Sequence, residues 1–224
     1  MIGVIPMASA THNLIDCVLQ FGDVCSAVID SSGSSIVINA RIPGSPSVPW
    51  IVVGSCVSFA LTVRGVLNLH ASAIAFNGVG HVLVGPRGFG KSLMAALACA
   101  EGADLVTDDM CAVTPRSGTW AVAPGTNMLR LRHPVETIQQ LFPSQELEVS
   151  SDGRTLLTLP TLEAPVPIAR IVFVVPDGTV RNTTMVELPS NEALFACLGN
   201  LRTPGLRDSI GRRGWRTRPR RRPT

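Results

Sequence analysis

The residues best suited to chemistry form a glycine-rich loop in the middle of the chain. Residues 85–92 read Gly-Pro-Arg-Gly-Phe-Gly-Lys-Ser and fit the pattern G-x-x-x-x-G-K-[ST] without a mismatch. Glycines let successive backbone N–H groups turn onto phosphate oxygens, and a following helix points its N-terminus at the same anion. The pattern therefore predicts a nucleotide site rather than an ordinary strand-to-helix turn. Its residues are Gly85, Pro86, Arg87, Gly88, Phe89, Gly90, Lys91 and Ser92.

Lys91 is the only lysine in a chain that contains eighteen arginines. Codon usage alone can deplete lysine, but a position that keeps it favours a compact ammonium over a planar guanidinium. In a phosphate-binding loop this lysine reaches the β- and γ-phosphates, and the hydroxyl of the next residue, Ser92, ligates Mg²⁺. We expect Lys91 to be catalytic as well as nucleotide-binding.

Two adjacent acids, Asp108 and Asp109, follow Lys91 by 17 and 18 residues, at the end of an expected strand. The carboxyl ends of strands in an α/β sheet gather ligand-binding groups. One acid can hold Mg²⁺ together with Ser92, and the other can accept a hydroxyl proton. The alternative is a strand-end turn capped by aspartate. His70, on the strand before the loop, is a further candidate, although a histidine on an apolar strand is often only a core or edge residue.

The elements that must position these residues are predicted from local patterns. Residues 69–76 and 81–84 read as two strands around Asn77-Gly78, a strong hairpin turn, so the second strand delivers the loop. Residues 92–100 read as a helix that stops at Gly102, and residues 103–107 read as the strand that carries the acids.

The remaining predicted elements frame this centre. They are a helix over 13–21, strands over 24–29 and 35–42, a connector over 41–49, a buried helix over 56–66, a hairpin of 111–114 with 119–122, a helix from Pro134 to Phe142, a buried strand over 168–175 and a helix capped by Ser190 and reaching about Leu201.

Length and charge suggest one main domain with appendages. We expect a small β-containing module over 1–55, the nucleotide-binding domain over 56–203 and an arginine-rich, disordered tail over 204–224. Residues 1–200 carry ten basic against fifteen acidic groups, whereas residues 201–224 carry nine arginines against Asp208. The net charge of +3 therefore originates in the tail, and the body lacks the basic cluster of a nucleic-acid-binding domain.

Cysteine usage and hydropathy indicate a cytoplasmic protein. The six cysteines form no CxxC pair and no His stands at metal-ligand spacing, which disfavours a zinc site and favours buried thiols in a reducing compartment. The start of the chain does not resemble a signal peptide, and the most apolar run, residues 50–63, is shorter than a membrane span. We expect neither a membrane nor a nucleic-acid partner.

Three stretches together resemble the HPr kinase/phosphorylase family. They are residues 69–74 (Leu-His-Ala-Ser-Ala-Ile), residues 77–92, which end in the loop, and residues 102–109, which end in the acid pair. With the flanks Leu-Thr-Val-Arg-Gly-Val at 61–66 and Ala-Pro-Gly-Thr-Asn-Met-Leu-Arg-Leu at 123–131, the resemblance covers roughly residues 55–200 and extends to short HPr kinase-like proteins of peptide-modifying gene clusters.

The resemblance implies an α/β fold with a P-loop nucleotide-binding core of the HPr kinase/phosphoenolpyruvate carboxykinase type. It implies His70 as the active-site histidine, Lys91 as the phosphate-binding lysine, Ser92 as a Mg²⁺ ligand and Asp108 with Asp109 as the catalytic acid pair. We expect Asp109 to accept the proton and Asp108 to lie on the metal side. Arg87 replaces a small residue of the family's loop, and the family's Glu-Ile-Arg-Gly stretch, with its metal-binding glutamate, is absent.

The leading functional hypothesis is an ATP- and Mg²⁺-dependent serine kinase whose partner is a peptide or small protein with an acceptor serine. The sequence does not decide whether the chain forms a homo-oligomer. The missing glutamate favours a second hypothesis, a nucleotide-binding regulatory module that transfers no phosphate. A carboxykinase is disfavoured, because that chemistry needs a larger substrate apparatus and more lysine.

Overall fold

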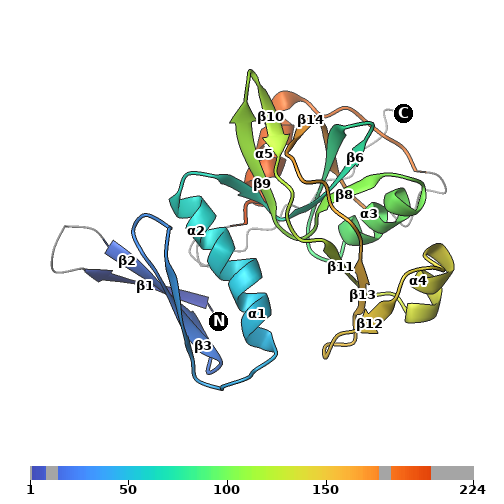
Figure 1. The fold of residues 1–224 in the computed structure, drawn as a ribbon. Coiled ribbons are helices and arrows are strands. Elements are labelled where there is room, and N and C mark those ends of the chain that lie inside the picture. The colour runs from blue at the N-terminus through green and yellow to red at the C-terminus, as the bar shows by residue number, and fades with distance from the viewer. Residues whose placement is uncertain (1, 9–14, 177–182, 203–224) are drawn as a thin grey trace, which may run out of the picture.

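The computed structural model describes residues 2–8, 15–176 and 183–202. It shows a mixed α/β chain with three sheets, and Figure 1 shows a helical rod between the N-terminal sheet and the rest of the molecule. The expected tail over 204–224 lies outside the described residues. No helix in the described ranges has the length and apolar character needed to cross a membrane.

The N-terminal sheet is antiparallel throughout. Its four strands, in spatial order, are β1 (Ile2–Ala8), β2 (Ile15–Phe21), β3 (Cys25–Ile29) and β4 (Ile36–Ala40).

The prediction of a helix over 13–21 was wrong, because residues 15–21 form β2. Cys17, Leu19 and Phe21 recur with period two and pack into one cluster with Cys56 and Phe59. This strand periodicity coexists with the helical spacing of apolar residues in the same short segment, and pairing with two neighbouring strands decides between them.

A helical rod follows the N-terminal sheet and packs against it. It consists of α1 (Ser47–Ile51), a π-helical segment η1 (Val52–Cys56) and α2 (Val57–Val63). The helix predicted over 56–66 therefore begins earlier, inside the expected connector, and ends earlier. The π-helical segment was not predicted; such segments are often found beside functional sites.

The main sheet has seven strands in the order β5-β9-β10-β14-β7-β6-β8. They are β5 (Leu67–Leu69), β6 (Ala71–Phe76), β7 (Val79–Val84), β8 (Asp104–Thr107), β9 (Cys111–Arg116), β10 (Thr119–Val122) and β14 (Val166–Phe173). Only β14 and β7 pair in parallel among these described strands.

Both faces of β6 are buried. On β6, Ala71, Ala73 and Ala75 belong to one apolar cluster, whereas Ile74 belongs to a second cluster that includes residues of α3 (Lys91–Ala100) and α4 (Val135–Leu141). The predicted Asn77-Gly78 hairpin, helix 92–100 and acid-bearing strand are confirmed, since they correspond to the β6–β7 turn, α3 and β8. The hairpin of β9 with β10 and the helix after Pro134 are confirmed too.

A third, antiparallel sheet was not predicted. Its strands are β11 (Met128–Leu131), β13 (Thr155–Thr158) and β12 (Leu147–Val149), and Figure 1 shows it beside α4. Its core side chains, Leu129, Leu131 and Leu157, pack with α3 and α4 in the second cluster. The short β12 and the turn-rich residues after it carry little periodicity.

Two predictions near the C-terminal end need correction. The buried strand predicted over 168–175 is wrong as to burial, because none of these residues is buried and Ile171 is 41% exposed. The strand itself is β14, and a register irregularity interrupts its pairing with β7. The last helix is α5 (Ser190–Gly199), and its N-cap is Pro189 without a side-chain hydrogen bond, so Ser190 is not the cap.

Candidate active site

The glycine-rich loop joins β7 to α3, in the order that its sequence predicts. A Cβ atom at Gly85 would lie 2.8 Å from the carbonyl oxygen of Val174, a contact that only glycine avoids. Gly90 is the N-cap of α3 and has a left-handed backbone, with φ of 87°. The loop therefore brings a helix N-terminus, which favours anions, to the end of a central strand.

Lys91 is the first residue of α3 and is buried. Its Nζ donates hydrogen bonds to the carbonyl oxygens of Gly85 and Pro86, at 2.8 and 3.2 Å. The lysine thus folds back over the loop that precedes it, and its ammonium group adds a positive charge to the helix N-terminus.

Asp108 follows β8 and is only 3% exposed. Its carboxylate accepts hydrogen bonds from the hydroxyl of Ser72 and from that of Ser92, the latter at 2.9 and 3.0 Å to its two oxygens. Burial raises the pKa of Asp108 and outweighs the two serine hydrogen bonds, which act to lower it. The two residues predicted to hold a metal therefore lie in contact.

Asp109 is in a different environment from its neighbour. Its side chain is 48% exposed, and its backbone has φ of 65°, a left-handed conformation that aspartate tolerates better than most residues. Oδ1 lies 3.0 Å from Nδ1 of His70. The predicted histidine and the predicted proton acceptor are thus brought together, although they are 39 positions apart in the sequence.

Arg202 is a site residue that the sequence analysis missed. Its Nη1 and Nη2 donate to Oδ1 and Oδ2 of Asp109, at 3.2 and 2.8 Å. Burial alone would raise the pKa of Asp109, but the hydrogen bond from His70 and the charges of Arg202, His70 and Lys91 outweigh it and lower the pKa to about 2. The two adjacent carboxyl groups therefore have pKa values displaced in opposite directions.

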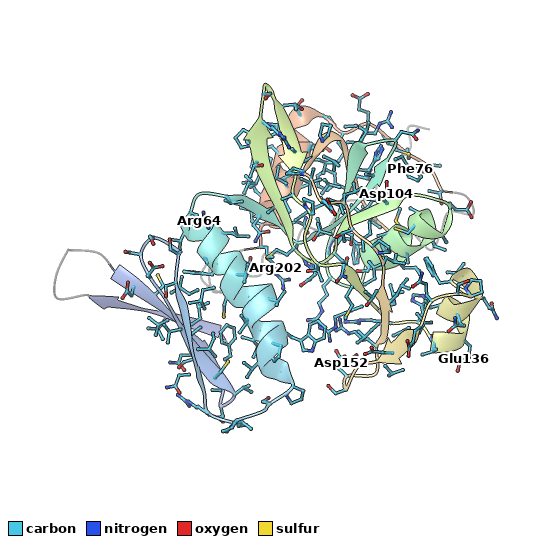
Figure 2. The ribbon with its side chains drawn as sticks, in the orientation of Figure 1. Arg64, Phe76, Asp104, Glu136, Asp152 and Arg202 are labelled. Carbon is cyan, nitrogen blue, oxygen red and sulfur yellow. The ribbon has the colours of Figure 1, made fainter. Side chains whose placement is uncertain are left out.

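Backbone pairing with β5 fixes the position of Arg202. Leu201 forms an antiparallel bridge with Leu69, the N–H of Arg202 donates to the carbonyl of Asn68 at 2.7 Å, and the N–H of His70 donates to the carbonyl of Asn200 at 2.8 Å. Figure 2 shows Arg202 near the middle of the molecule, between the helical rod and the main sheet. No local pattern announces this contact, because 93 residues separate Arg202 from Asp109.

The helical rod completes the surroundings of Arg202. The hydroxyl of Ser58 donates to the carbonyl of Arg202 at 2.7 Å and accepts a hydrogen bond from the amide of Asn68 at 2.8 Å. A Cβ atom at Gly54, in the π-helical segment, would lie 3.3 Å from Nη2 of Arg202. The absence of a side chain at Gly54 thus leaves space for the guanidinium group.

These groups line one cavity of about 640 Å³. It is bordered by the loop and Lys91, by the acid pair with His70 and Arg202, and by a basic group from neighbouring elements. We call this group the arginine wall; it consists of Arg87, Arg130, Arg132 and Arg154, together with Asp152. Only Arg87 among them belongs to a motif that is visible in the sequence, the glycine-rich loop. A cavity of this volume lies within the range of small-molecule and cofactor sites.

The donor set suits a magnesium–nucleotide complex better than a metal held by protein alone. Ser92 and Asp108 offer hydroxyl and carboxylate oxygens, the ligands that Mg²⁺ prefers, and Mg²⁺ usually takes its other ligands from phosphates and water. Within the described ranges no three His, Cys, Asp or Glu residues gather as a metal cluster. All six cysteines are free thiols; Cys25, Cys56 and Cys111 are buried, as expected, whereas the other three are only partly buried.

Comparisons with known proteins give only a distant structural similarity. No family model matches it, and no curated protein matches it. Among solved structures, the chain is similar to the Hpr(Ser) kinase/phosphatase from Coxiella burnetii, with 13% sequence identity, a TM-score of 0.34 and coverage of 51% of this chain and 69% of that chain. A likeness this distant carries no residue role to this chain.

Proposed function

We propose that the chain is an ATP- and Mg²⁺-dependent serine kinase that phosphorylates a peptide or small protein. One observation carries the proposal: Ser92, in the first turn of α3, is hydrogen-bonded to Asp108 at 2.9 Å, and the next residue, Asp109, also borders the cavity. A structural glycine-rich turn needs no buried carboxylate at its helix N-terminus. A site for a phosphate-bound cation does.

Each residue has a distinct part in binding. The backbone N–H groups of the loop and the ammonium of Lys91 would hold the phosphates, and Ser92 with Asp108 would hold Mg²⁺. When bound, the magnesium ion supplies charge neutralisation for the transferred phosphoryl group. It would also favour the ionised form of Asp108, whose pKa is raised by burial.

In the transfer, the serine oxygen would form a bond to the γ-phosphorus while the bond to the leaving oxygen of ADP breaks. The serine proton would pass to the carboxylate of Asp109, which borders the cavity and is oriented by His70. A carboxylate with a pKa near 2 is a weak base, so Asp109 would act late, after phosphoryl transfer has acidified the hydroxyl.

The test is incubation with Mg·ATP and serine-containing peptides, followed by mass spectrometry for a gain of about 80 Da, the mass of one phosphoryl group. Lys91→Ala should abolish productive ATP binding, and Lys91→Arg is the matched control that keeps the charge on a different shape. Unchanged ATP affinity and turnover in Lys91→Ala would contradict the assignment of the loop.

A second candidate function, a nucleotide-binding regulatory module, is favoured by the engagement of Asp109. Both of its oxygens are within 3.2 Å of Arg202 nitrogens, and one also faces His70. A carboxylate so occupied is well placed to hold the structure together and poorly placed to take a proton. ATP binding without any mass gain on a broad set of serine peptides would select this candidate.

A further inference from the structure

We propose that the arginine wall binds carboxylates of the acceptor, so that the substrate is a serine flanked by acidic residues. This inference rests on the proposed kinase function and names its substrate class. Its observations are the charge of the wall, the geometry of its side chains and the continuity of two cavities along it.

The wall carries an excess of positive charge. The wall contains four guanidinium groups and one carboxylate, that of Asp152. Arg130 and Arg154 both pair with Asp152, at 3.0 Å each. None of the ion pairs formed within the described parts of the chain includes Arg87 or Arg132.

Arg154 lies close enough to the other three arginines to be affected by their charges. Burial is the main cause that lowers the pKa of Arg154. The charge of Asp152 opposes it, and the charges of Arg130, Arg87 and Arg132 lower the pKa further. Arg130 is further restrained by Trp50, whose ring centre lies 4.5 Å from the guanidinium carbon. Such a pre-arranged cluster gains from a bound anion, and planar guanidinium forks match carboxylates in particular.

A nucleotide does not account for the whole wall. Its charge lies on the phosphates, which the loop and Lys91 would hold, while the ribose and base are uncharged. Arg87, within the loop, can serve the phosphates, but Arg130 and Arg154 come from the third sheet and the turn that joins its strands, where Figure 2 places Asp152. The wall therefore calls for a second anionic ligand.

The second ligand should be extended. A smaller cavity of about 260 Å³ shares Trp50, Ser55, Arg130 and Asp152 with the main cavity and continues to Ser47, at the start of α1, and to Ser151. A peptide whose serine lies at the acid pair could run along the wall toward this second cavity, with its acidic side chains on the arginines.

The test measures peptide binding directly, without nucleotide. Two fluorescein-labelled peptides of equal length, Glu-Glu-Glu-Ser-Glu-Glu-Glu and its all-Gln counterpart, are titrated with protein and followed by anisotropy. The proteins are the full chain, Arg132→Gln, Arg154→Gln and the control Arg116→Gln, which removes an exposed arginine of β9 that does not line either cavity. ATP affinity and the thermal midpoint are measured on the same proteins.

We expect the Glu peptide to bind at least about tenfold more tightly than the Gln peptide, and each wall variant to lose about tenfold of the Glu affinity, the scale of one charged hydrogen bond. Arg116→Gln should lose none. Arg132 forms no ion pair within the described residues, so Arg132→Gln tests the wall without breaking a native ion pair there.

Equal affinity for the two peptides would overturn the proposal, and so would a Glu preference that survives both wall variants. Weakened ATP binding with unchanged peptide binding would assign the wall to the nucleotide instead. A Glu preference without any phosphoryl transfer would remove the kinase and the acceptor role together, while transfer without a Glu preference would remove only the substrate class.

Discussion

Replacing Arg202 by glutamine tests the electrostatics of the acid pair most directly. Arg202 contacts both oxygens of Asp109, at 2.8 and 3.2 Å, and glutamine removes the charge while keeping a hydrogen-bonding side chain. His70 and Lys91 remain near the carboxylate in the variant. We therefore expect the pKa of Asp109 to rise, but to stay below its ordinary value of 3.8.

The magnitude follows from the displacement and the exposure. The pKa of Asp109 falls from 3.8 to about 2, and one unit corresponds to about 1.4 kcal/mol. Several groups share this effect, and solvent screens a side chain that is 48% exposed. We expect the pKa to rise by about one unit and the free energy of unfolding at neutral pH to fall by roughly 0.5–1 kcal/mol.

The stability deficit of Arg202→Gln should depend on pH in a defined direction. A carboxyl group whose pKa is lower in the folded state stabilises the fold above its unfolded-state pKa, near 3.9, and loses that contribution as pH falls through the folded-state value. The deficit of Arg202→Gln should therefore be complete above about pH 5 and shrink toward pH 2.

Urea unfolding from pH 2 to pH 7 measures this deficit, and carbon NMR of the Asp109 carboxyl group measures the pKa, with Arg116→Gln as the surface control. An unchanged Asp109 pKa in Arg202→Gln would refute the ion pair as its cause. A stability deficit that is the same at every pH would show that Arg202 acts through packing alone.

Further substitutions probe the acid pair and the loop. Asp109→Asn should keep nucleotide affinity within about tenfold but lower phosphoryl transfer by about 10²-fold or more, because asparagine cannot take up the proton. Asp108→Asn should instead weaken the Mg²⁺ dependence along with the rate. Near-normal transfer in Asp109→Asn alone would mean that the two aspartates have exchanged roles. Gly85→Ala should destabilise the fold by about 1–3 kcal/mol more than Gly88→Ala, although both glycines have positive φ. The reason is that only the methyl group at position 85 would meet backbone, 2.8 Å from the carbonyl oxygen of Val174. Equal urea midpoints for the two variants would contradict this contact.

Local sequence patterns were sufficient where an element is defined by its own residues. The Asn77-Gly78 turn specifies its hairpin because both residues adopt positive φ, at 49° and 75°. The helix after the loop ends where Gly102 takes up a left-handed conformation, with φ of 96°. Each of these signals lies within a few residues of the element that it defines, so the sequence alone is enough to locate the loop and the acid pair.

Patterns failed where distant segments decide the outcome. Residues 15–21 carry both helical and period-two spacing, and the neighbouring strands with the helical rod select the strand. The arginine wall depends on an unpredicted sheet whose strands are only three or four residues long. Arg202 reaches the site because its neighbour Leu201 forms an isolated backbone bridge with Leu69, and such a bridge leaves no periodic signal in the sequence.

The pKa values of Asp108 and Asp109 are displaced in opposite directions, which shows where local patterns stop being sufficient. As neighbours after one strand, they have the same local sequence context, so local reasoning cannot assign their roles. Asp108 turns into the protein, where burial raises its pKa and two serine hydroxyls hold it. Asp109 turns to the cavity, where His70 and Arg202 lower its pKa. Because that contrast depends on an arginine 93 positions away, the chemistry of the pair is set by the tertiary fold and not by the motif.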